Sequence, residues 1–362
     1  MKSRSAPKDG ASRRENLRSQ PPVEQRVFNN QRVLPKGWYP ICAARALKPG
    51  MCRSFKIFTQ RIVVYRAESG AVHALDAFCP HLGADLGNGR VVGERIQCYF
   101  HQWEYEGDGA LARIPCRKVL EQGLDGVRAR AYPVTEAYGH LWVFSAPVAS
   151  HALPKPPTLE DQELSALFIK EITLFAHHHV MMANGVDLQH FASVHKLDID
   201  FDYQIQADES GVFDWTLRGE IPTNTLKGRL ARWLLGPTFE YHARFAGGSI
   251  VTLTYGSNQS FKGLKLPSLQ MLWGCLPMEN GISKARIFLV TKKRRGLTGR
   301  LTNGLMYFLT ILLLTMLRDE DIEAFPHMRF NTHRLIKEDA SLARLIQLMN
   351  KLELSDWGDS GG

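Results

Sequence analysis

Two cysteines and two histidines in the first third of the chain form two mixed pairs, Cys79-x-His81 and Cys98-x-x-His101. Each pair offers one thiolate and one imidazole, and both groups bind zinc and iron. Zinc fingers, however, usually pair cysteine with cysteine and histidine with histidine. The mixed pairs therefore favour a two-iron cluster, in which the two thiolates hold one iron and the two imidazoles hold the other.

Three glycines lie between the two pairs, namely Gly83, Gly87 and Gly89. They allow the ligand loops to turn tightly, with backbone amides free to hydrogen-bond the cluster sulfurs. Replacing thiolate by neutral imidazole raises the reduction potential of such a cluster. The pattern therefore predicts an electron-carrying site between residues 78 and 103.

A second group of chemically capable residues lies in the stretch NGVDLQHFASVH, which supplies Asn184, Asp187, His190 and His195. On a helix the first three share one face, whereas His195 falls five residues beyond His190, where the helix must loosen or end. Two histidines and one distant carboxylate make the facial triad that holds non-haem iron(II) and leaves positions open for oxygen and substrate. The stretch therefore predicts a mononuclear iron site.

The third ligand of that iron must come from elsewhere in the chain. The acidic run RDEDIEAF, which contains Asp319 and Asp321, directly follows an apolar stretch and is a candidate. An acidic cluster on a helix is more often a solvated face than a ligand set. The residues alone therefore leave the third ligand open.

The segments CPHLGADLGNG, CYFHQW and GDG resemble the Rieske domain of Rieske-type non-haem iron oxygenases. One departure is Tyr99, where the family commonly has proline. Tyr99 lies between ligands and is not one, so we expect a small effect on loop shape or potential. The resemblance implies that Cys79, His81, Cys98 and His101 hold a [2Fe-2S] cluster.

The spacing Asn-x-x-Asp-x-x-His-x-x-x-x-His resembles the catalytic motif of the oxygenase α subunits. The resemblance implies that His190 and His195 bind the mononuclear Fe(II), that Asp187 is the bridge residue for electrons, and that Asn184 belongs to the same catalytic motif. A carboxylate that accepts hydrogen bonds from imidazoles on both sides is a short polar route for an electron. In the family this route crosses between subunits of a head-to-tail trimer, which implies at least a homotrimer.

The segment EDIEAF resembles the family's later segment that carries the third iron ligand, which points to Asp321, with Asp319 in reserve. The resemblance extends over residues 36–350 and looks closest to the single-α-subunit group, which includes the 3-ketosteroid 9α-hydroxylase oxygenase, cholesterol 7-desaturase and aminopyrrolnitrin oxygenase. It implies an α+β fold, with an N-terminal all-β Rieske domain followed by a helix-grip (START-like) antiparallel-sheet catalytic domain.

The patterning of the chain agrees with two domains. Apolar β-branched runs broken by glycine turns predict antiparallel strands up to Ala146, and a proline-rich stretch follows that reads as a linker. We therefore expect domains at 36–148 and 149–362. In the second domain, helices are expected near 184–196 and 297–350 around an antiparallel sheet.

Composition limits the remaining classes of protein. The 362 residues are 44% apolar and 22% charged, and six scattered cysteines do not suggest a disulfide framework, which favours a reducing cytoplasm. The net charge of +9 owes something to residues 1–32, which we expect to be a disordered basic tail. This tail has no apolar segment of a secretory signal. A nucleic-acid arm or transit peptide is the less favoured alternative, and no nucleic-acid partner is expected.

Two further stretches invite a functional interpretation. On a strand, His177, His178 and His179 would alternate between faces and could not converge on one ion, so we expect them not to be ligands. The run Leu301–Leu317 carries no charge over 17 residues, which is near the lower limit of about 17–25 residues for a membrane span. We expect a buried helix, and the neighbouring KKRR makes peripheral contact with an anionic membrane the alternative.

The main functional hypothesis is an oxygenase component. Electrons from NAD(P)H would arrive through a separate flavin/iron-sulfur reductase, with or without a ferredoxin, because no nucleotide-binding fingerprint is visible in the chain. With O2 the protein would hydroxylate or desaturate a hydrophobic, polycyclic or steroid-like substrate. Aromatic residues available to line a dry pocket are Trp215, Trp233, Phe239, Tyr241 and Trp273.

Three alternatives remain open. The substrate could be an aryl or arylamine secondary metabolite. The protein could instead be a Rieske electron carrier without turnover of its own, or a redox or oxygen sensor that keeps both metals.

Overall fold

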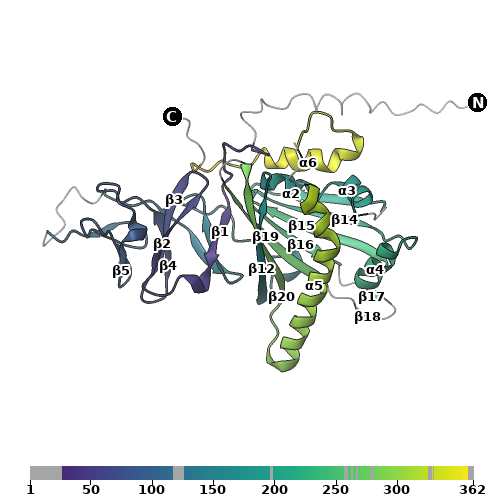
Figure 1. The fold of residues 1–362 in the computed structure, drawn as a ribbon, viewed down its shortest axis with the longest axis horizontal. Helices are drawn as coiled ribbons and strands as arrows, with labels where there is room; N and C mark the ends of the chain where they lie inside the picture. Colours follow the sequence, from purple (N-terminus) through teal and green to yellow (C-terminus); the bar gives the residue numbers. More distant parts are fainter. Residues whose placement is uncertain are drawn as a thin grey trace, which may run out of the picture.

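The chain folds into a smaller, all-β part and a larger part built on one wide sheet with helices (Figure 1). The computed structural model describes residues 27–116, 126–195, 199–256, 260–261, 264–265, 268–278, 281–324, 328 and 330–357. The two predicted ligand pairs lie in the smaller part, and the predicted iron motif lies in the larger part. This α+β architecture confirms the fold class predicted from the sequence.

The smaller part consists of three antiparallel sheets of short strands. The first contains β2 (Cys52–Ile57), β3 (Gln60–Arg66), β4 (Val72–Asp76) and β9 (Ala131–Tyr132). The second contains β5 (Arg90–Val92), β6 (Arg95–Gln97), β7 (Glu104–Tyr105) and β8 (Leu111–Arg113). The third contains β1 (Trp38–Ala43), β11 (His140–Phe144) and β10 (Val134–Ala137). Both metal-ligand loops belong to the end formed by the second sheet.

The larger part is built on a seven-stranded antiparallel sheet. Its order is β12 (Leu164–Leu174), β20 (Ser283–Lys292), β19 (Leu269–Pro277), β16 (Ile250–Tyr255), β15 (Thr238–Ala246), β14 (Val212–Glu220) and β13 (Asp202–Ala207). Along β15 every second residue is buried, as alternation of apolar and polar residues predicts. A small hairpin of β17 (Ser260–Phe261) and β18 (Leu264–Lys265) is also present.

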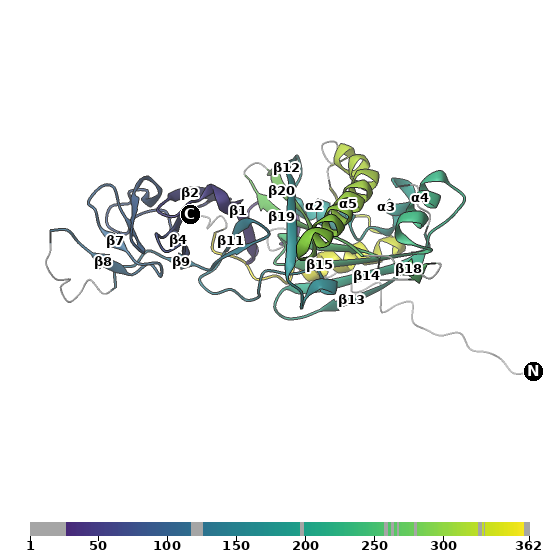
Figure 2. The same ribbon diagram turned by 90° about the horizontal axis from the view of Figure 1, so that it is seen from below.

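Five α-helices accompany this sheet in the described part of the chain. They are α2 (His178–Asn184), α3 (Leu188–Ser193), α4 (Leu226–Leu235), α5 (Gly296–Ala324) and α6 (Ala340–Met349). Short 3-10 turns lie at Ala44–Ala46, Leu86–Asn88, Pro157–Leu159 and Lys337–Asp339. The long helix α5 crosses one side of the sheet, where it packs against β19 and β20 (Figure 2).

The helix boundaries differ from those predicted. The span 184–196 is not one helix, because α2 ends at Asn184 and the Asp187 side chain caps a new helix, α3. The span 297–350 is likewise not continuous, because α5 ends at Ala324 and α6 begins at Ala340. Capping side chains that compete with the helical backbone bonds explain the first break.

The two parts share a hydrophobic core. Trp142 and Phe144 of β11 lie in one cluster with Leu272 and Phe288 of the large sheet. A Cβ atom at Gly274 would lie 2.5 Å from a ring carbon of Trp142, so this glycine lets the sheet approach the indole closely. The parts are therefore packed together as one body, and the domain boundary near residue 149 stays a prediction.

Both ends of the described chain cross between the parts. Near the C-terminus, Trp357 packs edge-on against Tyr132 of the smaller part, with ring centroids 4.8 Å apart. Near the N-terminus, Val27 and Phe28 are buried, and Phe28 joins the core of the large sheet. The predicted tail of residues 1–32 is therefore too long at its C-terminal end, because two apolar side chains there find a core. Residues 1–26 lie outside the described part.

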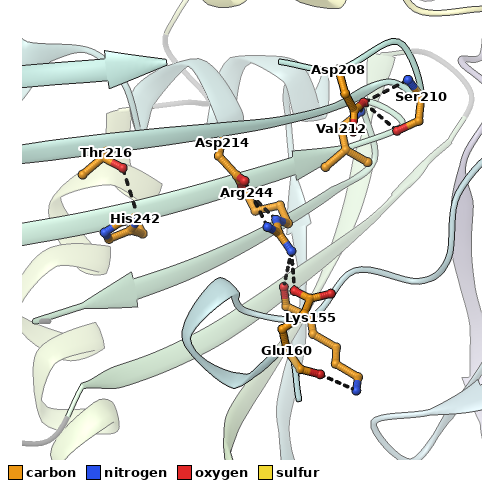
Figure 3. A network of polar contacts seen from close by, with 9 residues as sticks. All are labelled: Lys155, Glu160, Asp208, Ser210, Val212, Asp214, Thr216, His242 and Arg244. Atoms are coloured by element: carbon orange, nitrogen blue, oxygen red, sulfur yellow. Dashed lines mark hydrogen bonds and ion pairs between the residues drawn. The ribbon is translucent and has the colours of Figure 1, made fainter. Parts of the chain in front are cut away.

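One arginine fixes the segment between the two parts to the large sheet (Figure 3). Arg244 of β15 donates to both carboxylate oxygens of Asp214, at 2.8 and 3.0 Å, and to Oε2 of Glu160 at 2.6 Å. These two carboxylates raise the pKa of Arg244. Two-point contact of a guanidinium with a carboxylate defines orientation as well as distance, so this network holds the connecting segment in register with the sheet.

The apolar run Leu301–Leu317 is only partly buried, and the prediction of a buried helix is wrong for one face of α5. Asn303, Met306, Thr310 and Leu313 face inward and are buried. The 20-residue segment Gly296–Thr315 is long and apolar enough to cross a membrane by length and composition, but only 33% of its most apolar window is buried. The run thus carries apolar residues on both an inner and an outer face.

The three consecutive histidines begin a helix rather than lying on a strand, so the prediction that they cannot converge is wrong. Their rings lie 4.3–4.5 Å apart between centroids, and their nitrogen atoms lie within 4.8 Å of one another. Nδ1 of His177 accepts from the amide of His179, and Nδ1 of His179 accepts from the amide of Asn29. These bonds tie the start of α2 to the N-terminal segment.

Burial of this histidine cluster predicts acid-sensitive stability. Desolvation lowers the pKa of His177 to about 4 and the pKa values of His178 and His179 well below 6.5. In the unfolded chain histidines titrate near ~6.5, so below that pH the unfolded state binds protons that the folded state does not. Stability should be complete above pH ~6.5 and should fall as the pH decreases toward ~4.

The variant His177→Asn keeps a capping side chain and removes one titrating group. Its unfolding temperature, measured by calorimetry between about pH 7.5 and 5, should fall less steeply than that of the wild type. The difference corresponds to at most ~1.4 kcal/mol per pH unit. Parallel curves for the two proteins would contradict the assignment.

Candidate metal centres

The first ligand loop is closed by two backbone hydrogen bonds around Cys79. The amide of Cys79 donates to the carbonyl of Ala84 at 2.9 Å, and the amide of Gly83 donates to the carbonyl of Cys79 at 2.8 Å. Gly83 has φ +74°, a left-handed conformation that glycine adopts at little cost. The loop therefore turns back on its own cysteine and carries His81 at its tip.

The second ligand loop repeats this geometry. The amide of Cys98 donates to the carbonyl of Trp103 at 2.9 Å, and the amide of Gln102 donates to the carbonyl of Cys98 at 3.1 Å. Gln102 has φ +59°, in the position that corresponds to Gly83. The left-handed conformation is uncommon for a residue with a side chain, so the sequence gives no sign of this turn. The two loops form a matched pair.

The glycines after the first loop act through close packing rather than through unusual dihedral angles. A Cβ at Gly87 would lie 2.2 Å from Oγ of Ser54, and one at Gly89 would lie 2.1 Å from the carbonyl oxygen of Gln97. Neither glycine is among those with positive φ. Gly83 is therefore needed for its left-handed backbone conformation, whereas Gly87 and Gly89 are needed because a side chain would not fit there.

The matched loops bring like groups together. The Cys79 and Cys98 side chains are buried in one small core, whereas the rings of His81 and His101 lie toward the surface with centroids 4.8 Å apart. Trp103 stacks on His81 at 4.2 Å. Two thiols on the inside and two imidazoles on the outside fit a cluster whose two irons have different ligands.

Tyr105 is a neighbour that the sequence motifs do not identify. Its hydroxyl lies 3.1 Å from Sγ of Cys79, and burial raises the pKa of both groups. A hydroxyl that donates to a cluster thiolate stabilises the reduced state and tunes the potential. Tyr105 lies on β7, two residues after Trp103, and its side chain is buried in the same small core as Cys79 and Cys98.

The second centre lies between α2, α3 and the large sheet. Nε2 of His190 lies 3.0 Å from Nε2 of His195 and 3.0 Å from Nδ2 of Asn184. The two histidines are buried. The amide of His195 donates to the carbonyl of His190 at 3.4 Å, so the helix loosens there as the spacing predicts. Two converging imidazole nitrogens fit neighbouring positions around one iron.

Asp187 holds the start of α3. Its Oδ1 accepts from the amides of Gln189 at 3.1 Å and His190 at 3.3 Å. The carboxylate is half-buried. Its recorded partners are therefore backbone amides of its own helix rather than imidazoles on both sides, and its role as an electron bridge stays a prediction.

The third predicted iron ligand falls at the end of α5. The backbone of Asp319 and Asp321 belongs to this helix, but their side chains lie outside what the structure describes. The choice between these two aspartates stays a prediction.

An apolar cavity of about 100 Å³ adjoins the second centre. Its polar lining includes His190, His195 and Asn184, and Leu314 of α5 contributes to its apolar lining. Of the aromatic residues named from the sequence, Tyr241 and Trp273 line the cavity. The other three do not line it: Trp215 and Phe239 are buried elsewhere in the core, and Trp233 is exposed. Methionines that also line the cavity, including Met181 and Met271, have no sequence signal that separates them from core.

Comparison with known proteins identifies the smaller part. A family model described as Rieske [2Fe-2S] domain matches residues 37–127. The chain is 33% identical to cholesterol 7-desaturase nvd of Bombyx mori over 44% of this chain and 35% of that protein. The match therefore spans about a third of the relative's length.

Similarity over a longer stretch includes the second part. The chain is 26% identical to the 3-ketosteroid-9-alpha-monooxygenase oxygenase component of Rhodococcus rhodochrous, over 87% of this chain and 83% of that protein. A carbazole 1,9a-dioxygenase oxygenase, solved with fluorene and its ferredoxin, superposes with a TM-score of 0.65 at 14% identity. That match covers 92% of this chain and 96% of the other, and it shows a common fold.

Changing one imidazole ligand to thiolate should lower the potential of the first centre. We expect His81→Cys and His101→Cys to shift the midpoint potential downward by on the order of 100 mV, because an anionic thiolate stabilises ferric iron. Redox titration followed by electron paramagnetic resonance measures the shift. The exposed His333→Cys adds the same residue far from the loops and is the control. Unchanged spectra in both ligand variants would remove the cluster assignment.

Proposed function

We propose that this chain, which belongs to the Rieske-type non-haem iron oxygenases of the α-subunit type, is a terminal oxygenase component that hydroxylates or desaturates a hydrophobic substrate. The observation that carries the proposal is the pairing of two donor sets in one chain. One set has two thiols and two imidazoles, and the other has two imidazoles beside an apolar cavity. An electron carrier needs only the first set.

Two features of the second centre, its imidazole pair and its apolar cavity, support oxygen chemistry. When bound, the cluster supplies electrons and the mononuclear iron supplies the position at which oxygen is activated. Nε2 of His190 and Nε2 of His195 are the atoms that would hold this iron, and the side chain of Asn184 lies beside them, with its Nδ2 3.0 Å from Nε2 of His190. The apolar lining of the cavity excludes water from the reacting carbon.

In this proposal Asp187 has two roles: it positions His190, and it carries the electron between subunits. Through its bonds to the amides of Gln189 and His190, it sets the position from which the His190 side chain reaches the cavity. Its half-buried carboxylate is also available to a residue from outside the chain. We propose that a cluster histidine of a second subunit approaches there in a homotrimer, so that the electron passes along the carboxylate.

The size and lining of the cavity support a proposal for the substrate class. A cavity of about 100 Å³ is smaller than typical ligand pockets of ~300–1,000 Å³, so it takes the reacting end of a larger apolar molecule. A steroid-like polycyclic substrate suits this lining, and an aryl or arylamine substrate is the alternative. We propose that a separate NAD(P)H-dependent reductase supplies the electrons. The absence of pairing among the six cysteines supports a reducing cytoplasm.

The role of Asp187 is testable by removing its charge. Asparagine caps helices as well as aspartate does, so Asp187→Asn should keep the fold and about three irons per chain. Turnover should fall by about 100-fold or more, because the lost charge lies on the proposed electron route and outside the iron ligands. The exposed Asp202→Asn is the matched control.

Stopped-flow measurement of cluster reoxidation separates this role from a structural one. The Asn variant should be reduced at the normal rate and reoxidised slowly. Normal turnover in the Asn variant would sink the bridging role, and about two irons per wild-type chain would favour a simple electron carrier.

The substrate class is tested with a panel of sterols, fused-ring hydrocarbons, arylamines and small polar acids. Incubation of the holoprotein with a compatible reductase and O2 should give a product of at least one apolar polycyclic compound, altered at one carbon. Mass spectrometry detects a gain of one oxygen for hydroxylation or a loss of two hydrogens for desaturation. Turnover of a polar acid alone would overturn the substrate class and leave the oxygenase function in place.

A further inference from the structure

The outer face of α5 is apolar although it is exposed. Five large apolar side chains follow one another along the outer face and form a stripe, which we call the α5 stripe. Their exposed fractions are 75% for Leu297, 66% for Leu301, 57% for Leu305, 62% for Phe308 and 39% for Ile311. Their spacing of three or four residues places them on one side of the helix.

The inner face of α5 already packs against the large sheet, so packing within the chain does not account for the stripe. Asn303 accepts a hydrogen bond from Arg294 at 2.9 Å, and Thr310 bonds back to the carbonyl of Met306 at 2.8 Å. The inner face therefore combines these polar groups with the buried apolar side chains of Met306, Leu313 and Leu314, while the stripe lies on the outer face. Helices of soluble proteins normally carry polar residues on the face away from the core, so an exposed apolar stripe of this length indicates a contact outside the chain.

Cations are concentrated where α5 begins. Between residues 292 and 318 the chain has six arginine or lysine residues and no acidic residue. Lys292, Lys293, Arg295 and Arg300 are exposed. The nearest acid is Glu163, which lies 3.5 Å from Lys293 and 3.9 Å from Arg295. One carboxylate shared by two cations leaves a clear excess of positive charge at this end of the stripe.

A second helix has the same character. On α4 the side chains of Leu226, Leu230 and Trp233 are exposed at helical spacing, and Arg229 is exposed beside them. Figure 2 draws α4 and α5 on the same side of the large sheet. Exposed leucine and tryptophan beside cations are typical of helices that lie in a lipid interface.

We propose that the α5 stripe and its flanking cations dock this protein on the surface of an anionic membrane. From Leu297 to Ile311 the stripe is about 21 Å long at ~1.5 Å per residue, which suits a helix lying along the interface. The cations at its start would meet lipid phosphates. A second copy of the chain fits less well, because this segment has no acid with which to pair an identical basic segment.

The same helix connects the membrane surface to the cavity. Leu314, one turn beyond Ile311 and on the inner face, lines the apolar cavity beside the second centre. An apolar compound dissolved in the lipid would therefore have a short path to the site. This last step rests on the proposed function, whereas membrane docking itself requires no catalytic activity.

Vesicle sedimentation of the full-length holoprotein tests the proposal. The protein should bind vesicles of phosphatidylcholine with about 30% phosphatidylserine, and binding should weaken sharply at about 0.5 M NaCl. Lys293→Gln combined with Arg295→Gln should lower the partition coefficient by about 30-fold. Leu301→Ser or Phe308→Ser should lower it by about tenfold each, because each removes an apolar side chain from the lipid.

The matched control is Phe175→Ser, since Phe175 is 64% exposed and Phe308 is 62% exposed. Circular dichroism and the cluster absorption of every variant should equal those of the wild type, because only exposed side chains change. The proposal is overturned if the wild type does not bind the anionic vesicles, or if the stripe variants bind as the wild type does. Stripe variants that change the mass measured by light scattering, with unchanged vesicle binding, would assign the stripe to contact between copies instead.

Discussion

A single carboxylate oxygen organises the second centre. Oδ1 of Asp187 accepts from the amides at the start of α3, and this pair of bonds separates α2 from α3. Without that break, Asn184 and His190 would lie on one straight helix nearly two turns long. With it, the chain bends, and Nδ2 of Asn184 lies 3.0 Å from Nε2 of His190. The cavity, the imidazole pair and the proposed electron route all depend on this cap.

The geometry of the first centre depends on two ligand loops of the same shape rather than on a single hydrogen bond. Each ligand loop is closed by the same pair of backbone hydrogen bonds about its cysteine, with a left-handed residue in the same place. Two loops of equal shape present two buried thiols on one side and, on the other, the half-buried imidazole of His81 and the exposed imidazole of His101. The two imidazoles would hold one iron on the more exposed side of this end of the protein, and an electron would leave from that side.

The sequence predicted ligand types and strands well because both depend on local pattern. Cys79 and His81 were identified by type and spacing, and the alternation along β15 predicted its buried face. Helix boundaries were missed where a side chain competes for backbone bonds, as Asp187 does. The contribution of Tyr105 was missed because only the pairing of β6 with β7 brings its hydroxyl to Cys79. The convergence of the three histidines also depends on a helix start that periodicity does not mark.

The apolar run on α5 shows what hydropathy alone leaves undetermined. Apolar residues lie on both faces of the helix, so hydropathy does not reveal which face meets the sheet. The structure buries the face that carries Met306, Thr310 and Leu313, which packs against the sheet and beside the cavity. Leu301 and Phe308 contribute little to the core of this chain, although such side chains favour burial by ~1.5–3 kcal/mol each. An apolar partner would account for their place on the outer face. The cations at the start of the helix indicate that the surface of this partner is negatively charged.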